Sequence, residues 1–272
     1  MRRIPGGFTL VEIAIAMFII VLVLGSILVP LTTQVESRNF DTTQRILDQA
    51  RDALIGYAAA NGRFPCPASA TQTTEHFAAG GSAANGLCHG TVTSAVAGVF
   101  VYAGYLPAAT LGFAPVDANG YAVDAFGALT QNRIRYAISY QTVNGVVRPF
   151  TTLPNPPTNT LGMRAAGMSN ILGTSLLNVC TTTTGSSNTV CAAGTALTSN
   201  AIVVIWSLGP NAATTGGVSA DEAENAEAFA AADRVWVMRT KSSVTATEFD
   251  DVVTWISPPV VFNRLVAAGQ LP

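Results

Sequence analysis

One acidic side chain stands alone in an apolar run near the start of the sequence. Residues 8–29, FTLVEIAIAMFIIVLVLGSILV, contain a single charged residue, Glu12. An ionised carboxylate in an apolar interior costs about 3 kcal/mol on insertion scales unless a partner compensates it. A partner should therefore compensate the charge of Glu12, unless Glu12 is an ordinary acid at the interfacial end of a helix.

The four cysteines fall into two close pairs, Cys66 with Cys88 and Cys180 with Cys191. Each pair encloses a segment rich in Gly, Ala, Ser and Thr, and neither has the spacing of a zinc or redox motif. Two structural disulfides are the simplest interpretation, and the N-terminal residues support it, because they independently indicate export to an oxidising compartment. Free buried thiols are the alternative.

Acidic residues gather at two places late in the chain. One group crowds the stretch SADEAENAEAFAAAD, and Asp250 with Asp251 precedes the last predicted strand. Calcium prefers several oxygen ligands on a flexible loop. Asp250 and Asp251 are therefore candidate calcium ligands, although the spacing fits no EF-hand. The alternative for both groups is a solvated charged surface, with an irregular loop and a helical turn over the first.

The rest of the composition favours no catalytic function. His76 and His89 are the only histidines, and both lie in or beside a Gly- and Ala-rich loop, where solvent is the expected environment. No nucleophile elbow, metalloprotease motif, P-loop or dinucleotide fingerprint occurs. We predict a protein that is not an enzyme and needs no cofactor, calcium aside. A net charge of −2 with one lysine predicts no nucleic-acid partner.

The order of signals at the N-terminus differs from that of a secretory signal peptide. A basic start, Arg2 and Arg3, is followed at once by Gly6 and Gly7, and only then by the apolar run. Cleavage after Gly7 would leave the run on the mature chain, beginning at Phe8. As a helix it would be about 33 Å long, which matches a bilayer core. Arg2 and Arg3 would hold the N-terminal end in the cytoplasm, which places the chain after the apolar run on the far side of the membrane.

These residues, GGFTLVEIAIAMFIIVLVLGSILVP, resemble the class III signal of type IV pilins and of type II secretion pseudopilins. The resemblance implies a structural subunit of a pilus or pseudopilus filament, cut between Gly7 and Phe8 by prepilin peptidase and N-methylated at Phe8. It implies that Glu12 pairs with the free amine of a neighbouring subunit. Partners would be other pilin or pseudopilin subunits, the peptidase and the inner membrane. Some major pseudopilins also bind calcium near the C-terminus.

The same resemblance predicts the location. The subunit would be a single-pass inner-membrane protein with its head in the periplasm, and a filament component after assembly. The long Thr-rich insertions in the head leave an alternative: a minor tip pilin whose head is an adhesive or substrate-binding module.

The elements that position these residues follow from periodicity. We expect a helix over 8–60, because apolar residues recur at three and four positions in RILDQARDALIGY, and a left-handed C-cap at Asn61 and Gly62. The predicted organisation is a cleaved leader (1–7), a membrane or filament-core helix (8–30), an amphipathic helix (31–62) and a globular head (63–272).

Strand patterns dominate the predicted head. RIRYAISY alternates as a half-buried strand, AIVVIWS is continuously apolar, and DRVWVMRT and DDVVTWIS follow, with Arg234 and Arg239 expected to point outward. The aromatic residues on these patterns are expected in the core, a ligand-binding patch being the alternative. The fold class is α+β: a long N-terminal helix packed on a mainly antiparallel sheet.

Overall fold

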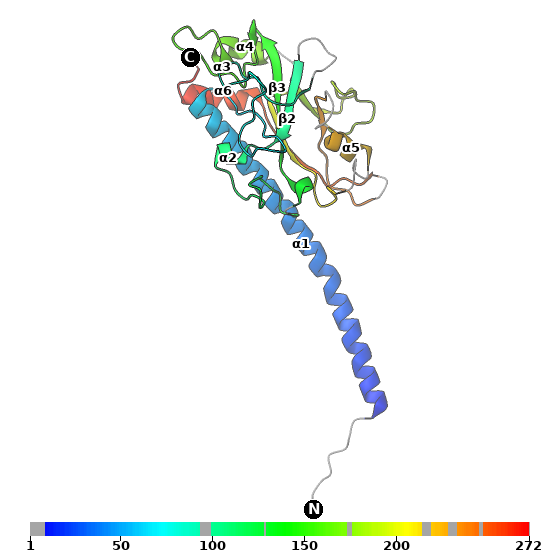
Figure 1. The fold of residues 1–272 in the computed structure, drawn as a ribbon. Helices are drawn as coiled ribbons and strands as arrows, with labels where there is room; N and C mark the ends of the chain where they lie inside the picture. Colours follow the sequence, from blue (N-terminus) through cyan, green and yellow to red (C-terminus); the bar gives the residue numbers. More distant parts are fainter. Residues whose placement is uncertain are drawn as a thin grey trace, which may run out of the picture. The chain divides into compact units, whose positions relative to one another are not determined.

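The computed structural model describes residues 9–92, 99–127, 129–172, 176–213, 219–227, 233–244 and 247–271, with the backbone alone for 24–33, 91–92 and 99–100. The chain divides into two compact units, Met1–Asp41 and Thr42–Pro272, and each is described by itself. Helix α1 (Leu10–Asn61) contributes residues to both units (Figure 1).

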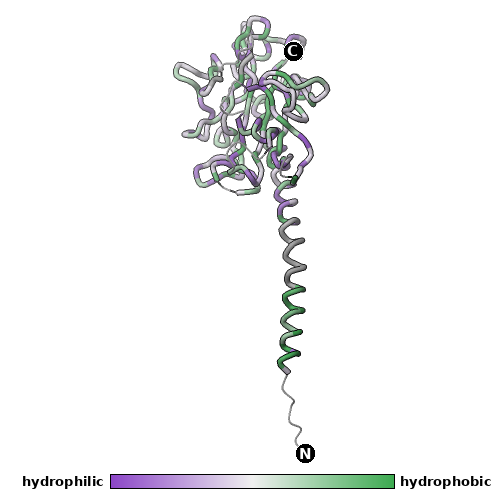
Figure 2. The backbone as a smooth tube through the Cα atoms, turned by 90° about the vertical axis from the view of Figure 1, so that its right-hand side faces the viewer, coloured by the Kyte–Doolittle hydropathy of each residue, from purple (hydrophilic) through white to green (hydrophobic). Residues whose placement is uncertain are grey.

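The first unit contains the apolar start of α1. Figure 2 shows this segment in the colour of hydrophobic residues. Its large apolar side chains are exposed on every side of the helix, from 49% at Val23 to 88% at Leu10. No helix within the described residues has the length and apolarity that crossing a membrane requires. The predicted span 8–30 lies partly outside them, because Phe8 and the side chains of 24–33 are not described.

The second unit begins with the amphipathic end of α1. Of the predicted apolar stripe, Ala53 and Tyr57 are half-buried. Ile46, Ala50 and Leu54 of the same stripe are buried, joined by Leu47 and Ala58. This spacing of three and four residues puts them on one side of the helix. They belong to a core cluster that also contains side chains of the large sheet and of the C-terminal helix. Burial of this stripe therefore fixes α1 on the sheet from residue 42 onward.

Helix α1 ends at the predicted cap. Gly62 has a φ of +69° and donates its N–H to the carbonyl of Ala58 at 2.8 Å. A Cβ at this position would also meet the ring of Pro154 at 2.9 Å. Glycine is required here both by the left-handed backbone and by the close approach of Pro154.

The large sheet has six strands in the order β1-β2-β3-β7-β9, with β4 beside β3, and every pair in it is antiparallel. Its strands are β1 (Thr91–Val92), β2 (Val99–Tyr105), β3 (Arg135–Val143), β4 (Val146–Val147), β7 (Val203–Ser207) and β9 (Val252–Ile256). The strands expected from RIRYAISY, AIVVIWS and DDVVTWIS are thus confirmed, as is the α+β class with a mainly antiparallel sheet.

A second, three-stranded sheet was not predicted. It has the order β6-β5-β8, with β5 (Leu177–Cys180) antiparallel to β6 (Ala196–Ala201) and parallel to β8 (Val235–Val237). Its side chains form a second core cluster with the face of the large sheet that is turned away from α1. The rings of Trp206 and Trp236 meet edge to face there, with centroids 5.5 Å apart.

This second layer corrects two predictions from the sequence. Strand β3 is not half-buried, because Ala137 and Ser139 are covered on the face opposite Tyr136 and Ile138. Arg234 does not point outward: it is 3% exposed and donates to the carbonyls of Leu176 and Thr189. The aromatic residues Trp206, Trp236, Tyr102 and Tyr136 are fully buried, as expected of core residues.

Short helices complete the second unit. They are α2 (Ala108–Leu111), the 3₁₀ turn η1 (Thr130–Asn132), α3 (Gly162–Ala166), α4 (Met168–Leu172), α5 (Ala220–Glu227) and α6 (Pro258–Ala267). Pro258 and Pro259 follow strand β9 and begin α6, since a proline in the first helical turn has no hydrogen bond to lose. Val261, Phe262 and Leu265 of α6 pack into the same core cluster as α1.

Candidate functional site

Glu12 lies in the first turn of α1, where it forms a capping box with Thr9. The Thr9 N–H and hydroxyl donate to Glu12 Oε2 at 2.8 and 2.9 Å, and the Glu12 N–H donates to Thr9 Oγ1 at 3.3 Å. The sequence signal for this box, a threonine three residues before a glutamate, is present in TLVE and was overlooked. Within the described residues, Glu12 Oε1 has no hydrogen-bond partner and remains available to another chain.

The predicted processing positions, Gly7 and Phe8, lie outside the described residues. The structure therefore gives the surroundings of Glu12 and not those of the predicted cleavage site.

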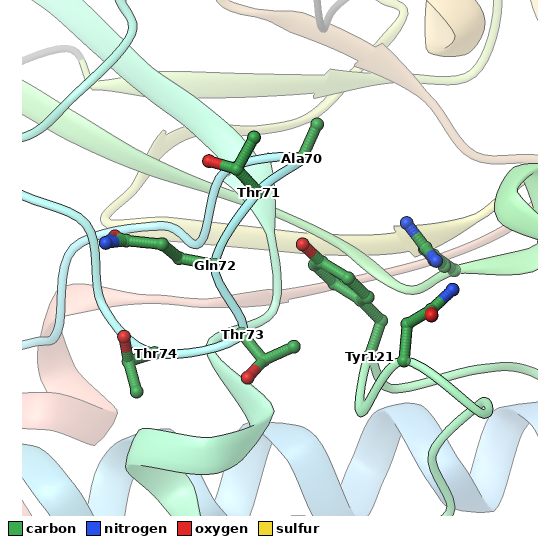
Figure 3. Close-up of a pocket in the computed structure, with 8 residues that line it drawn as sticks. Ala70, Thr71, Gln72, Thr73, Thr74 and Tyr121 are labelled. Atoms are coloured by element: carbon green, nitrogen blue, oxygen red, sulfur yellow. The ribbon is translucent and has the colours of Figure 1, made fainter.

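A polar pocket of about 680 Å³ opens on the second unit. Figure 3 shows the residues that line it: Ala70, Thr71, Gln72, Thr73, Thr74, Asn119, Tyr121 and Arg133. The first five form one segment of the Cys66–Cys88 loop, and the hydroxyl of Tyr121 is directed toward that segment. Sequence reasoning missed this site, because its residues come from three separate loops of ordinary polar composition.

Arg133 is the only charged residue that lines the pocket, and its charge is compensated. Its Nε donates to Asp117 Oδ2 at 2.7 Å. Burial opposes ionisation of Asp117, but hydrogen bonds from the N–H groups of Tyr121 and Asn119 and the Arg133 guanidinium together lower its pKa. The guanidinium lies 3.8 Å from the ring centroid of Tyr121. Asp117 and Arg133 therefore form an ionised pair with no net charge.

Arg133 keeps two donor groups for a ligand. Although the residue is only 6% exposed, it lines the pocket. Within the described residues its Nη1 and Nη2 atoms have no hydrogen-bond partner, and neither does the hydroxyl of Tyr121. An arginine that uses Nε for one partner can still present the two Nη atoms end-on to another.

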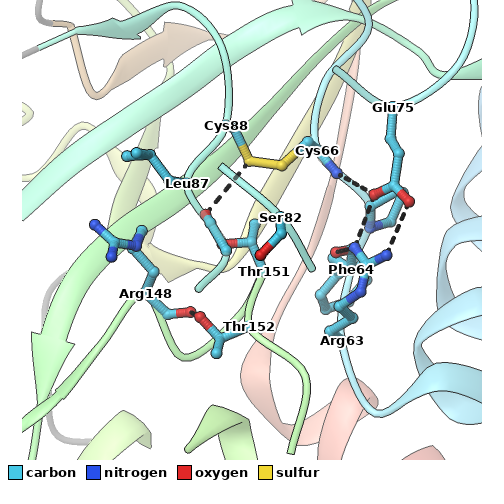
Figure 4. Close-up of a disulfide and its surroundings, with 12 residues drawn as sticks. Arg63, Phe64, Cys66, Glu75, Ser82, Leu87, Cys88, Arg148, Thr151 and Thr152 are labelled. Atoms are coloured by element: carbon cyan, nitrogen blue, oxygen red, sulfur yellow. Dashed lines mark hydrogen bonds and ion pairs between the residues drawn. A yellow bond between two sulfur atoms is a disulfide. The ribbon is translucent and has the colours of Figure 1, made fainter. Parts of the chain in front are cut away.

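The loop that lines the pocket is held at several points (Figure 4). Arg63, just beyond α1, donates from Nη1 and Nη2 to the two carboxylate oxygens of Glu75, both at 2.8 Å. The same carboxylate accepts from the N–H of Cys66 at 3.3 Å, and the Glu75 N–H donates to Thr110 Oγ1 at 2.7 Å. The segment 70–74 is thus anchored although it has no helix or strand of its own.

Both predicted disulfides are present. Cys66 and Cys88 join the ends of the pocket loop, while Cys180 and Cys191 join the end of β5 to the hairpin tip that follows it. The Cys66–Cys88 sulfurs are fully buried within the main core cluster. Each disulfide closes a loop that has little regular structure. This cross-link restricts the conformations of the unfolded chain more than those of the folded one.

The acidic residues are only partly a solvated surface, since Glu227 is exposed but Glu222 is buried. The stretch predicted as a loop with a helical turn contains helix α5, whose Glu222 is 1% exposed and accepts from the Asp250 N–H and the Asn211 side chain, both at 3.1 Å. Asn225 of α5 donates to Asp251 Oδ2 at 2.8 Å. Burial raises the pKa of Asp251 well above its ordinary value. These carboxylates connect α5 to the start of β9.

The calcium prediction gains no ligand set from this arrangement. Among the residues that the structure describes, no three or more His, Cys, Asp or Glu side chains are placed to hold a metal ion. Asp250 and Asp251 are 5% and 7% exposed. A calcium site at these two residues stays a prediction.

His76 and His89 stack on each other, with ring centroids 4.1 Å apart and planes 4° from parallel. His89 is exposed, as expected, but His76 is partly buried. Burial, with a smaller contribution from His89, lowers the pKa of His76. The stack therefore adds to the effect of burial on His76, since a charged His76 ring would be disfavoured beside a second imidazole.

Comparisons with known proteins identify no relative: no protein-family model, no curated protein and no solved structure matches the chain.

Proposed function

We propose that this chain is a structural subunit of a type IV pilus-like or type II secretion pseudopilus filament. In this proposal prepilin peptidase cuts after Gly7, and Phe8 becomes the methylated N-terminus. The subunit waits in the inner membrane with its head in the periplasm, and then joins the filament through the N-terminal helix. The observation that carries the proposal is a helix start that is apolar on all sides and contains one acid.

The exposed apolar residues need a covering. Between Leu10 and Val23 the large apolar side chains are all at least 49% exposed. A helix that is apolar all round is stable only when lipid or other protein surrounds it. Because the residues cover every side and not one stripe, several neighbours or a bilayer are required. A bundle of equivalent helices at a filament centre supplies that environment.

Glu12 supplies the polar contact within such a bundle. The carboxylate already accepts two hydrogen bonds from Thr9 through Oε2, so Oε1 can receive the Phe8 amine of a neighbouring subunit. Such a pair fixes the axial register of the two helices more than it adds net stability, because desolvation offsets much of the Coulomb attraction. The two disulfides fit the oxidising compartment that the head would occupy.

Three substitutions separate processing, capping and assembly. Gly7→Val should block cleavage. Glu12→Gln should be cleaved normally, but it leaves the neighbour's amine unpaired in an apolar core, at a cost of about 3 kcal/mol, and incorporation should fall more than about tenfold. Thr9→Val removes the capping hydroxyl and keeps the acid, so it is the matched control that should still be incorporated.

The measurement is the amount of each variant in sheared filaments, compared by immunoblot with the processed form in membranes. Normal incorporation of Glu12→Gln would contradict the pairing. Equal loss in Thr9→Val and Glu12→Gln would show that Glu12 acts only as a helix cap.

The polar pocket favours a second candidate function, that of a minor tip pilin whose head binds a ligand. The pocket presents donors and acceptors without protein partners, which a purely structural head does not need. Abundance separates the two candidates. A chain that makes up most of a purified filament is a bulk subunit, and a chain present in trace amounts is a minor one.

A further inference from the structure

We infer that the pocket between the Cys66–Cys88 loop and Tyr121 is a binding site for a neutral carbohydrate. The inference names the ligand class of the binding head in the second candidate function, and it rests on that candidate for its biological use. Three properties of the pocket lead to it: its lining, its charge and its rigidity.

The lining consists almost entirely of hydroxyl and amide groups. Thr71, Thr73 and Thr74 contribute hydroxyls, Gln72 and Asn119 contribute amides, and Tyr121 adds a phenol hydroxyl. Each of these groups can both donate and accept a hydrogen bond, as each sugar hydroxyl can. The Thr71 hydroxyl already bonds to Ser69 Oγ at 3.0 Å, but an apolar ligand would leave the other groups without partners, which costs free energy at each of them. A saccharide satisfies both sides.

The charge of the pocket favours a neutral ligand. Arg133 is the only charged side chain in the lining, and its ion pair with Asp117 leaves no net positive charge. A phosphate or carboxylate would be attracted by Arg133, but Asp117, which accepts from Arg133 Nε at 2.7 Å, offsets part of that attraction. The two open Nη groups can instead donate to adjacent hydroxyls of one sugar ring, for which a planar fork has the right geometry.

The pocket is pre-formed. The Cys66–Cys88 disulfide, the Arg63–Glu75 ion pair and the hydrogen bond from Ala109 N–H to the Thr73 carbonyl at 3.1 Å hold the loop that lines it. Its volume of about 680 Å³ lies in the range of small-molecule sites. Because Arg133 covers a face of the Tyr121 ring, hydrogen bonds and not ring stacking would supply most of the affinity. A Kd of about 1 mM or below is expected.

The test uses the full chain in a zwitterionic detergent, because alkyl glycoside detergents would compete for the pocket. Binding of neutral saccharides (maltose, lactose, cellobiose and N,N′-diacetylchitobiose) is measured by saturation-transfer NMR and calorimetry. Galacturonic acid, N-acetylneuraminic acid and inorganic phosphate are measured in parallel. At least one neutral saccharide should bind, and more tightly than the acidic sugars or phosphate.

Two conservative variants locate the site. Tyr121→Phe and Thr73→Val each remove one hydroxyl that has no hydrogen-bond partner within the described residues, so the fold should be unaffected and Kd should rise about three- to tenfold. Thr240→Val, at an exposed threonine outside the pocket, is the matched control and should bind normally.

The inference is overturned if no neutral saccharide binds, if only acidic sugars or phosphate bind, or if the two pocket variants bind as well as the control. Binding is measured on the purified chain and does not require a filament. A failure here therefore leaves filament assembly untouched, and a failure of incorporation leaves the binding result valid.

Discussion

Replacing Glu75 by glutamine tests whether the ion pair with Arg63 holds the pocket loop in place. The two guanidinium–carboxylate hydrogen bonds, both 2.8 Å long, connect the chain just after α1 to the middle of the Cys66–Cys88 loop. The glutamine side chain has the same shape, but it can accept from Arg63 with one atom only. The substitution therefore leaves one N–H donor of the Arg63 guanidinium facing the side-chain NH2 group of the glutamine, which is also a donor.

The expected loss of unfolding free energy depends on how deeply the Arg63–Glu75 pair is buried. The Arg63 and Glu75 side chains are 5% and 17% exposed. Breaking a buried pair by changing one partner costs about 3 to 5 kcal/mol, and the partial exposure of Glu75 places this pair at the lower end. We expect Glu75→Gln to lower the free energy of unfolding by about 3 kcal/mol. The double variant Arg63→Met with Glu75→Gln should lose less stability than the sum of the two single variants, because it leaves no charged side chain without its partner.

Equilibrium urea unfolding of the full chain in detergent, followed by the fluorescence of the buried Trp206 and Trp236, measures these effects. Glu227→Gln, at an exposed glutamate, is the matched control and should change stability by less than about 0.5 kcal/mol. A loss below about 1 kcal/mol for Glu75→Gln, or strictly additive effects in the double variant, would refute the role assigned to this pair. Saccharide binding by Glu75→Gln should weaken as well, because the loop loses an anchor.

Three further predictions concern the second unit. Burial and the neighbouring Glu224 raise the pKa of Asp233 to about 8. Between about pH 4 and 8 the folded state then holds a proton that the unfolded state has released, so this group makes the free energy of unfolding fall as pH rises. Asp233→Asn should remove about 1.4 kcal/mol per pH unit from that slope. An unchanged slope in urea unfolding at several pH values would contradict this. Gly104→Ala should lower stability by about 2 kcal/mol because its Cβ would meet the Ala68 carbonyl oxygen and, at 2.8 Å, the Cβ of Pro67. Gly56→Ala, within α1 and with nothing within 4 Å, should raise it by about 1 kcal/mol, and equal melting temperatures for the two variants would contradict both expectations.

Local patterns in the sequence were sufficient for the elements whose causes are local. The stripe of α1, the Gly62 cap and the strands β3, β7 and β9 follow from periodicity and from glycine and proline chemistry. The two disulfides also follow from spacing along the chain. In each case the residues that decide the structure lie in one short segment of the chain, the longest being the 22-residue separation of Cys66 and Cys88.

The remaining features depend on residues that are distant in sequence. Arg234 has the sequence pattern of a surface residue on a strand, and only the carbonyl groups of Leu176 and Thr189 explain its burial. The pair of Arg133 with Asp117 joins two loops in the same way. The alternation of apolar and polar residues along one strand cannot show whether a second sheet covers the polar face of that strand. The pocket was missed for the same reason.

The single residue between strands β6 and β7 limits how this sequence can change. Ile202 is the whole connection between β6 of the small sheet and β7 of the large one; its N–H donates to the Ile256 carbonyl, and its carbonyl accepts from the Ser139 N–H. Because side chains alternate along a strand, one inserted residue here would exchange the two faces of β7 or of β6 and turn buried side chains outward. The Cys66–Cys88 and Cys180–Cys191 loops have no such constraint. Variation in length among natural relatives is therefore expected in those two loops, while the number of residues across 196–207 stays fixed.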